Sequence, residues 1–233
     1  LVVNDGPRFD AAAVFTSNRV EAAPVTWSRH VVADGRVDAV FLNSGGANAC
    51  TGHQGFQDTH RTAELVAEAL GSGAGDIAIC STGLIGELLP MDKIADGVDL
   101  AVATLTDEGG PAAATAIMTT DTVPKVAQVP RDGWSVGGMA KGAGMLAPAL
   151  ATMLVVLTTD ADVAGLDLDA VLRAATATTF DRIDSDGCMS TNDTVLLMAS
   201  GAAGVTPSPD ELTAAVTEVC ASLARQLIAD AEG

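Results

Sequence analysis

The sequence predicts a layered α/β fold. Stretches with the apolar pattern of buried strands alternate loosely with stretches whose apolar residues recur at helical spacing. No low-complexity linker interrupts this alternation. The chain has 233 residues, of which 48% are apolar and 18% charged. It is therefore long and apolar enough for one large or two small domains with a packed core.

The first predicted elements are a strand and a helix. The short apolar run at 37–42 indicates a buried strand, which leads into a loop of small residues. Residues 58–70 carry apolar side chains on one helical face, where Asp58 or Thr59 can serve as N-cap and Gly71 can end the helix. We therefore expect a strand, a loop and a helix in the first third of the chain.

A second strand, a second helix and a hairpin follow. Residues 77–80 indicate a short strand, and the apolar spacing of 92–105 predicts a helix with one buried face. The segment PRDG at 130–133 has the composition of a tight turn. We therefore expect the flanking strands, 125–129 and 134–138, to pair as a hairpin.

The last third of the chain predicts two strands, each followed by a helix. The run MLVVLT at 153–158 and the run at 194–199 are rich enough in apolar and β-branched residues for buried strands. The first is followed by a helix at 167–178. The second is followed by a long amphipathic helix at 209–229, which begins with Pro-Asp-Glu, residue types favoured in a first helical turn.

The charge balance excludes two classes of partner. The 30 acidic and 12 basic side chains give a net charge of −18, and no basic stripe is present. Such a field repels nucleic acid and anionic membranes. Aromatic residues make up only 3%, too few for a base-stacking surface, and no uninterrupted apolar run reaches the length of a membrane span. We expect a soluble globular protein.

The cysteines predict a reducing compartment. Cys50, Cys80, Cys188 and Cys220 are widely spaced, and none belongs to a CxxC pair. In a chain of this size they indicate reduced, mostly buried thiols of a cytoplasmic protein, and their spacing does not favour a zinc site. The front of the sequence has no signal-peptide pattern.

The candidate nucleophiles are threonine and serine. The three histidines lie in the first quarter of the chain and form no HExxH pattern, and the GxSxG and GxxxxGK[ST] motifs are absent. A hydroxyl nucleophile must therefore work without an evident histidine base. A threonine made N-terminal by chain cleavage has such a base in its own α-amino group, whose reference pKa of about 7.7–8.0 suits proton transfer near neutrality.

The stretch KGAGMLAPALATMLVVLTTD, residues 141–160, has the composition that such a cleavage needs. Gly142, Gly144 and Pro148 supply a small, strained approach, and the strand that follows supplies a rigid support behind Thr152. The alternative is that Thr152 is an ordinary β-branched residue at the start of a strand, where threonine is common. The residues by themselves leave both interpretations open.

The segment FDRIDSDGCMSTND is rich in oxygen-bearing side chains, including Asp181, Asp184, Asp186 and Asp193. It lacks the spacing of an EF-hand loop and the glutamate that closes one. We expect a structural loop in which aspartate and asparagine side chains bind nearby backbone groups. The alternative is that the segment supports a nearby active site.

Several long blocks resemble one enzyme family. In chain order they read AAAVFTSNRVEAAPV, LNSGGANACTG, CSTGLIGELLPMDK, AIMTTDTVPK, AKGAGMLAPALATMLVVLTTDA and DRIDSDGCMSTNDTVLLMASG. Together they closely resemble the ornithine acetyltransferases, also called glutamate N-acetyltransferases, of bacterial arginine biosynthesis, and the resemblance covers essentially the whole chain. It implies an αββα fold with two β-sheets layered between helices, similar to N-terminal-nucleophile hydrolases in architecture but different in connectivity.

The resemblance implies a self-cleaving acetyltransferase. The family's cleavage site matches Ala151–Thr152, so residues 1–151 would be the α-subunit portion and residues 152–233 the N-terminal part of the β-subunit. Thr152 would take the acetyl group from N2-acetylornithine as an acetyl-threonine and pass it to glutamate, a ping-pong exchange. Whether acetyl-CoA also serves as a donor stays open.

Five further residues match functional positions of the family. Thr82 and Gly83 match the pair that stabilises the oxyanion, and Thr119, Lys141 and Glu232 match substrate contacts. Lys141 would hold the α-carboxylate that both substrates share, and Glu232 would suit the side-chain ammonium. From the residues alone, a lysine beside glycines is usually solvated, and a glutamate so near a chain end is usually frayed.

The resemblance also sets expectations about cofactors, assembly and missing parts. It implies no metal and no organic cofactor, and cleaved α and β chains that pair as heterodimers and assemble into heterotetramers or larger. Family members continue beyond the final DAEG, where an asparagine and a serine or threonine supply further substrate contacts. Two rival interpretations are a self-cleaving aminopeptidase or amidase with water as the acceptor, and a non-catalytic small-molecule-binding paralogue.

Overall fold

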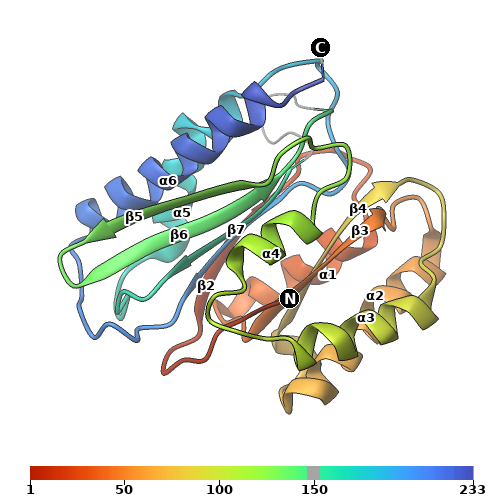
Figure 1. Ribbon diagram of the computed structural model, residues 1–233, viewed down its shortest axis with the longest axis horizontal. Helices are drawn as coiled ribbons and strands as arrows, with labels where there is room; N and C mark the ends of the chain where they lie inside the picture. The colour runs from red at the N-terminus through yellow and green to blue at the C-terminus, as the bar shows by residue number, and fades with distance from the viewer. Residues whose placement is uncertain (146–152, 233) are drawn as a thin grey trace.

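The chain folds into four layers, in which two β-sheets face each other and helices cover both outer faces (Figure 1). The structure is a computed structural model that describes residues 1–145 and 153–232. The predicted α/β class and αββα layering are confirmed. The strands are β1 Val2–Val3, β2 Asp10–Phe15, β3 Ala39–Gly46, β4 Ile77–Leu84, β5 Lys125–Arg131, β6 Trp134–Lys141, β7 Leu154–Thr159 and β8 Thr194–Ala199. The helices are α1 Ala23–Val31, α2 Gly52–Leu70, α3 Met91–Ala103, α4 Gly110–Ala116, α5 Leu168–Thr178 and α6 Pro209–Ala229.

The larger sheet has the strand order β2-β8-β7-β6-β5. β7 and β8 run parallel, and the other neighbouring strands run antiparallel. Successive side chains of β7 point to opposite faces: Val155 and Leu157 join the core under the outer helices, whereas Leu154 and Val156 join the core between the sheets. Because both faces of this strand are buried, its sequence is a near-continuous apolar run.

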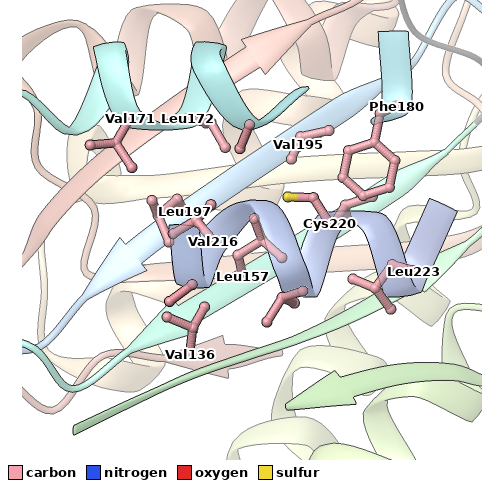
Figure 2. Packing of buried hydrophobic residues seen from close by; sticks show 14 of the residues in the cluster. Val136, Leu157, Val171, Leu172, Phe180, Val195, Leu197, Val216, Cys220 and Leu223 are labelled. Atoms are coloured by element: carbon pink, nitrogen blue, oxygen red, sulfur yellow. The ribbon is translucent and has the colours of Figure 1, made fainter. Parts of the chain in front are cut away.

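Helices α5 and α6 cover the outer face of the larger sheet (Figure 1). Each begins with a side-chain cap: Asp167 accepts a hydrogen bond from the Ala170 N–H, and Ser208 forms a capping box with Glu211. Figure 2 shows how the helices and the sheet meet. The labelled core residues come from the sheet (Val136, Leu157, Val195 and Leu197), from α5 and the turn after it (Val171, Leu172 and Phe180) and from α6 (Val216, Cys220 and Leu223).

Helix α6 is long and apolar enough, by length and composition, to pass for a membrane span. Its apolar side is nevertheless packed against other elements of the protein. Leu212, Val216, Val219 and Leu223 are fully buried in the core that α6 shares with α5 and the larger sheet. We therefore assign α6 as a core helix.

The smaller sheet has the order β1-β3-β4, with β3 and β4 parallel. Helices α2 and α3 pack on its outer face, and α1 lies along the free edge of β4. Ser28 Oγ donates to the Ile79 carbonyl at 2.7 Å and accepts from the Ile79 N–H at 2.8 Å, and Trp27 Nε1 donates to the Ile77 carbonyl at 3.0 Å. The helix thus satisfies backbone groups that an open sheet edge would expose.

Most predicted elements are confirmed, with shifts at their ends. β8 and α6 have the predicted bounds, and Gly71 ends α2 in the left-handed conformation. The predicted cap of this helix is wrong: α2 begins at Gly52, and Asp58 and Thr59 lie buried inside it. Thr59 Oγ1 there accepts a hydrogen bond from the Asn48 side chain. The first turns of α2, GHQGFQ, have no apolar periodicity, which hides them from pattern analysis.

Four of these strands and helices, β1, β2, α1 and α4, have no counterpart among the predictions, and β1 has only two residues. β2 reads DAAAVF, and alanine has weak strand propensity, so its pattern is faint. α1 and α4 are short, with nine and seven residues, and both start with a proline in the first turn. Short helices give too few repeats for a clear periodicity.

The expectation of mostly buried thiols holds for half of the cysteines. All four cysteines are free; Cys80 and Cys220 are buried, but Cys50 and Cys188 are exposed. Burial raises the pKa of the Cys80 and Cys220 thiols to about 12, which keeps them protonated and unreactive.

Candidate active site

The ends of β4, β6 and β7 meet where the two sheets approach each other. Lys141 is the last residue of β6 and pairs in register with Leu154, the first residue of β7. β6 thus runs three residues past its predicted end at Gly138, so Lys141 belongs to a strand. Its ammonium crosses to the smaller sheet, where Thr82 lies near the end of β4.

Lys141 is buried, with 2% of its surface exposed. Its Nζ donates to Thr119 Oγ1 at 2.7 Å and to Thr82 Oγ1 at 3.2 Å. Burial lowers the pKa of Lys141, the charge of Asp121 opposes this effect, and the charge of Lys125 adds to it. The interpretation of Lys141 as a solvated lysine is therefore wrong, and three of the predicted site residues are in direct contact.

Gly83 follows Thr82 at the end of β4 and pairs with Gly45 of β3. Its φ is +128°, and a Cβ atom built on it would lie 2.3 Å from the Gly45 carbonyl carbon and 2.7 Å from the Gly46 nitrogen. Only glycine fits a backbone approach this close. The two parallel strands therefore hold the backbone of Gly83 rigidly beside the Thr82 hydroxyl.

Asp121 connects several parts of the site. Its Oδ1 accepts from Lys125 Nζ at 2.7 Å and from the Gly142 N–H at 2.6 Å, and its Oδ2 accepts from the Thr119 N–H at 3.1 Å. Burial alone raises the pKa of Asp121, but these donors and the charge of Lys141 together lower it. The carboxylate is thus held ionised beside the ammonium of Lys141, 3.8 Å away.

The C-terminal end of the described chain is tied to the site. Glu232 donates its backbone N–H to the Ala143 carbonyl at 2.7 Å, although its side chain is exposed. A Cβ atom built on Gly144 would lie 3.5 Å from Glu232 Oε2, so the carboxylate lies beside the residues that follow β6. Two residues earlier, Asp230 accepts from Lys125 Nζ at 2.6 Å. The interpretation of Glu232 as part of a frayed end is therefore wrong.

Two aspartates of the acidic loop bind the residues on either side of 146–152. Asp186 Oδ2 accepts from the Met145 N–H at 2.7 Å, and Asp193 Oδ1 accepts from the Met153 N–H at 3.0 Å. Burial raises the pKa of Asp193 well above its ordinary value, although the Met153 N–H and neighbouring hydroxyls oppose this effect. Asp184 binds the Gly187 N–H within the loop. The loop thus makes local contacts, as expected, and also contacts the site, as the alternative proposed.

The predicted cleavage site lies outside the described residues, because Pro148, Ala151 and Thr152 all fall within 146–152. The residues that lead up to it are described. Gly142 is buried and donates its N–H to Asp121, so the backbone is held in place at the start of the segment that leads to the predicted cleavage site.

Within residues 1–145 and 153–232, no group of three or more His, Cys, Asp and Glu side chains is arranged to hold a metal ion. A cleft of about 540 Å³ is lined by β2, the end of α1 and the start of α5. It contains none of the converging residues, so we do not place the chemistry there.

A protein-family model described as the ArgJ family matches residues 1–233. The chain belongs to the ArgJ family. Two bacterial relatives, both named arginine biosynthesis bifunctional protein ArgJ, are similar over the whole chain: the protein of Streptomyces coelicolor at 67% identity and that of Thermobifida fusca at 64%. The chain spans 61% of the length of each of these relatives.

Solved structures of the ArgJ family resemble this chain in fold. The ornithine acetyltransferase of Mycobacterium tuberculosis, solved in complex with ornithine, is 54% identical with a TM-score of 0.62, over 65% of this chain and 81% of that one. The Bacillus halodurans ArgJ structure is 34% identical with a TM-score of 0.51, over 63% of this chain and 78% of that one. A protein of Pyrococcus horikoshii, 13% identical with a TM-score of 0.52 over all of this chain and 81% of that one, shows the fold alone.

The structure adds three residues to the predicted site of this ArgJ-family chain: Asp121, Lys125 and Asp230. The first two lie in the block AIMTTDTVPK and are separated by four residues, a spacing that suggests an ion pair only on a helix, which this segment is not. Asp230 lies 105 residues from its partner Lys125. No sequence pattern links residues so far apart, so only the fold reveals this contact.

Proposed function

We propose that this ArgJ-family chain is part of a self-cleaving acetyltransferase that moves an acetyl group from N2-acetylornithine to glutamate. The observation that carries the proposal is the convergence of Thr82, Thr119 and the buried Lys141 within hydrogen-bond distance beside the start of β7. Thr152 precedes that strand by two residues. Cleavage before it would divide the chain into residues 1–151 of an α-subunit and residues 152–233 of a β-subunit.

The proposed acetyl transfer needs a nucleophile, a base and an oxyanion site. Thr152 Oγ would attack the acetyl carbonyl while the α-amino group freed by cleavage takes the hydroxyl proton. The carbonyl oxygen would become an oxyanion that receives hydrogen bonds from the Thr82 hydroxyl and the Gly83 N–H. Collapse of this intermediate expels the amine of ornithine, which takes up the proton, and leaves acetyl-Thr152. The neutral amine of glutamate would then attack the ester carbonyl, the bond to Thr152 Oγ breaks, and the α-amino group of Thr152 carries the proton from the attacking amine to the leaving hydroxyl, which restores the free threonine.

The surrounding groups suit the two substrates. Both substrates carry an α-carboxylate, and the buried ammonium of Lys141 can bind it with a charge-assisted hydrogen bond. The exposed carboxylate of Glu232, beside Gly144, can bind the side-chain ammonium of ornithine. Asp193 supports the geometry because it anchors the Met153 N–H, one residue after the proposed nucleophile.

The proposal also covers the assembly of the chains, their location, the cofactors and a second acetyl donor. The cleaved chains would pair as heterodimers and assemble further, in the cytoplasm, without a metal or organic cofactor. Transfer from acetyl-CoA to glutamate would be a second activity of the same nucleophile.

The test uses the full-length protein that contains this chain. Intact mass and N-terminal sequencing should give two fragments, one of which starts Thr-Met-Leu-Val. The Thr152→Ala variant should remain a single uncleaved chain. Its transfer rate should fall by at least about 10³-fold, because both the nucleophile and the cleavage are lost. A single chain that transfers acetyl at the normal rate would refute the mechanism. Acetate release that does not depend on glutamate would instead indicate an amidase or aminopeptidase.

A further inference from the structure

Lys125 is a fully buried lysine whose place in the reaction is not explained by the roles proposed above. Its ammonium donates to Asp121 at 2.7 Å, to Asp230 at 2.6 Å and to the Val123 carbonyl at 3.3 Å. These three acceptors match the three donors of an ammonium group. Apolar side chains of similar volume would fill such a site without the cost of desolvating charges, so the question is what the buried charges do.

The first carboxylate held by Lys125 controls one side of the candidate site. Asp121 fixes the backbone of Thr119 and of Gly142 through their N–H groups. Oδ1 accepts two hydrogen bonds and Oδ2 accepts one, and Lys141 Nζ lies 3.8 Å from Oδ2, beyond hydrogen-bond distance. Lys141 donates its hydrogen bonds instead to neutral threonine hydroxyls, and its ion pair with Asp121 is a long one of 3.8 Å.

The second carboxylate held by Lys125 controls the other side. Asp230 also accepts from the Thr122 N–H at 2.9 Å and from the Thr122 hydroxyl. Burial raises the pKa of Asp230, but Lys125 and Thr122 outweigh it and lower the pKa to about 2, so this carboxylate is ionised. It ends the helix two residues before Glu232, whose backbone is bound to Ala143. Lys125 is thus the link between the Lys141 side and the Glu232 side.

We propose that Lys125 is a positioning residue that keeps the charge of Lys141 available for a substrate carboxylate. The inference rests on the proposed function. While Lys125 neutralises Asp121, Lys141 can exchange its hydroxyl partners for the substrate. Without Lys125, Asp121 would draw Lys141 from 3.8 Å into a hydrogen-bonded ion pair, which is much stronger in a buried site than in water. Asp230 would at the same time lose the contact that places the Glu232 segment.

The test compares Lys125→Met and Lys125→Arg in the full-length enzyme. For Lys125→Met we expect the KM values of N2-acetylornithine and of glutamate to rise together, by about 10- to 100-fold, because both substrates lose the same charge-assisted hydrogen bond. The kcat should change by less than about threefold, since this contact is made equally before and during the chemistry. Arginine can still pair with two carboxylates, so Lys125→Arg should restore most of the KM.

Arg131→Met is the matched control. Arg131 lies on the same strand as Lys125 and pairs with Glu218 of α6 at 2.7 Å, so it joins the same strand to the same helix. This pair is partly exposed and touches none of the site residues. We expect wild-type KM values for this variant. If Lys125 only stabilised the fold, Lys125→Met would lower the Tm and leave the KM of the folded enzyme unchanged.

A second variant covers the case in which Lys125→Met does not fold. In Lys125→Met, Asp121 and Asp230 both lose the ammonium that neutralises them. Adding Asp230→Asn removes one of these two charges and leaves Asp121 free to pair with Lys141, so the rise in KM should persist. A folded single or double variant whose KM values stay within about twofold of wild type overturns the inference. Wild-type enzyme that does not transfer acetyl from N2-acetylornithine to glutamate instead overturns the proposed function, which separates the two failures.

Discussion

Replacing Gly83 by alanine is expected to destabilise the fold because the backbones of β3 and β4 nearly touch there. A methyl group at this position would lie 2.3 Å from the Gly45 carbonyl carbon and 2.5 Å from its oxygen. The φ of +128° adds a second penalty, because this region of backbone space is used almost only by glycine. Gly45, directly across the strand pair, provides a matched control: its φ is +120°, but an added Cβ would meet nothing within 4 Å.

The two penalties can be separated from these distances. The unfavourable φ costs about 1–3 kcal/mol at either position. The overlap of atoms at position 83 adds about 1–3 kcal/mol, the usual cost of forcing extra atoms into a packed interior. We therefore expect Gly83→Ala to lose about 2–6 kcal/mol and Gly45→Ala about 1–3 kcal/mol. The first is a large share of the total stability of an ordinary domain, about 5–15 kcal/mol.

Urea unfolding of the full-length protein measures the difference. Both variants are made in the Thr152→Ala background, which stays a single chain whether or not the wild type cleaves itself. With a denaturant slope of about 2–3 kcal/mol per molar, the extra cost of about 1–3 kcal/mol should place the midpoint of Gly83→Ala about 0.3–1.5 M below that of Gly45→Ala. Equal midpoints would refute the close approach of the strands. In the cleavable background, Gly83→Ala should also lower kcat by about 10²-fold or more, because the oxyanion donor moves.

Two further predictions concern stability. The pKa of Asp193 is raised by burial, so the folded protein keeps a proton that the unfolded chain releases above about pH 4, and stability falls as the pH rises from there. Asp193→Asn keeps an oxygen that can accept from the Met153 N–H. The Tm of this variant minus the Tm of the same protein with Asp193 should therefore increase as the pH rises. A Tm difference that is constant with pH would contradict this. Leu157→Ala in the core should cost about 2–5 kcal/mol in urea unfolding, against less than about 0.5 kcal/mol for the exposed Leu100→Ala, and similar losses would contradict the assigned burial.

The local pattern of the sequence was sufficient for the elements that carry strong local signals. Strand β8 and helix α6 have the predicted bounds because one is a β-branched threonine followed by an apolar run and the other has a proline and a capping box at its start. The start of α2 was missed because its first turns are polar and glycine-containing, and they are held by Asn48 from the preceding loop. Tertiary contacts outweigh weak propensity at such ends.

The sequence also carried the family, through long blocks such as CSTGLIGELLPMDK and AKGAGMLAPALATMLVVLTTDA, and with it the choice of Thr82, Thr119 and Lys141. It could not show that these residues touch, because they come from β4, β6 and the loop before β5. Their contact depends on the two sheets packing face to face, which follows from burial of apolar surface on both faces of the larger sheet.

The sequence by itself determined the periodicities that make strands and helices, the excess of acidic charge and the membership of the ArgJ family. Only the tertiary structure decided which charges are buried. Lys125 and Asp230 are 105 residues apart, and in an extended chain each would be hydrated like any other surface residue. Folding removes water from the Lys125 ammonium and covers most of the Asp230 side chain, so the two charges pair, and this pair joins the start of β5 to the end of α6.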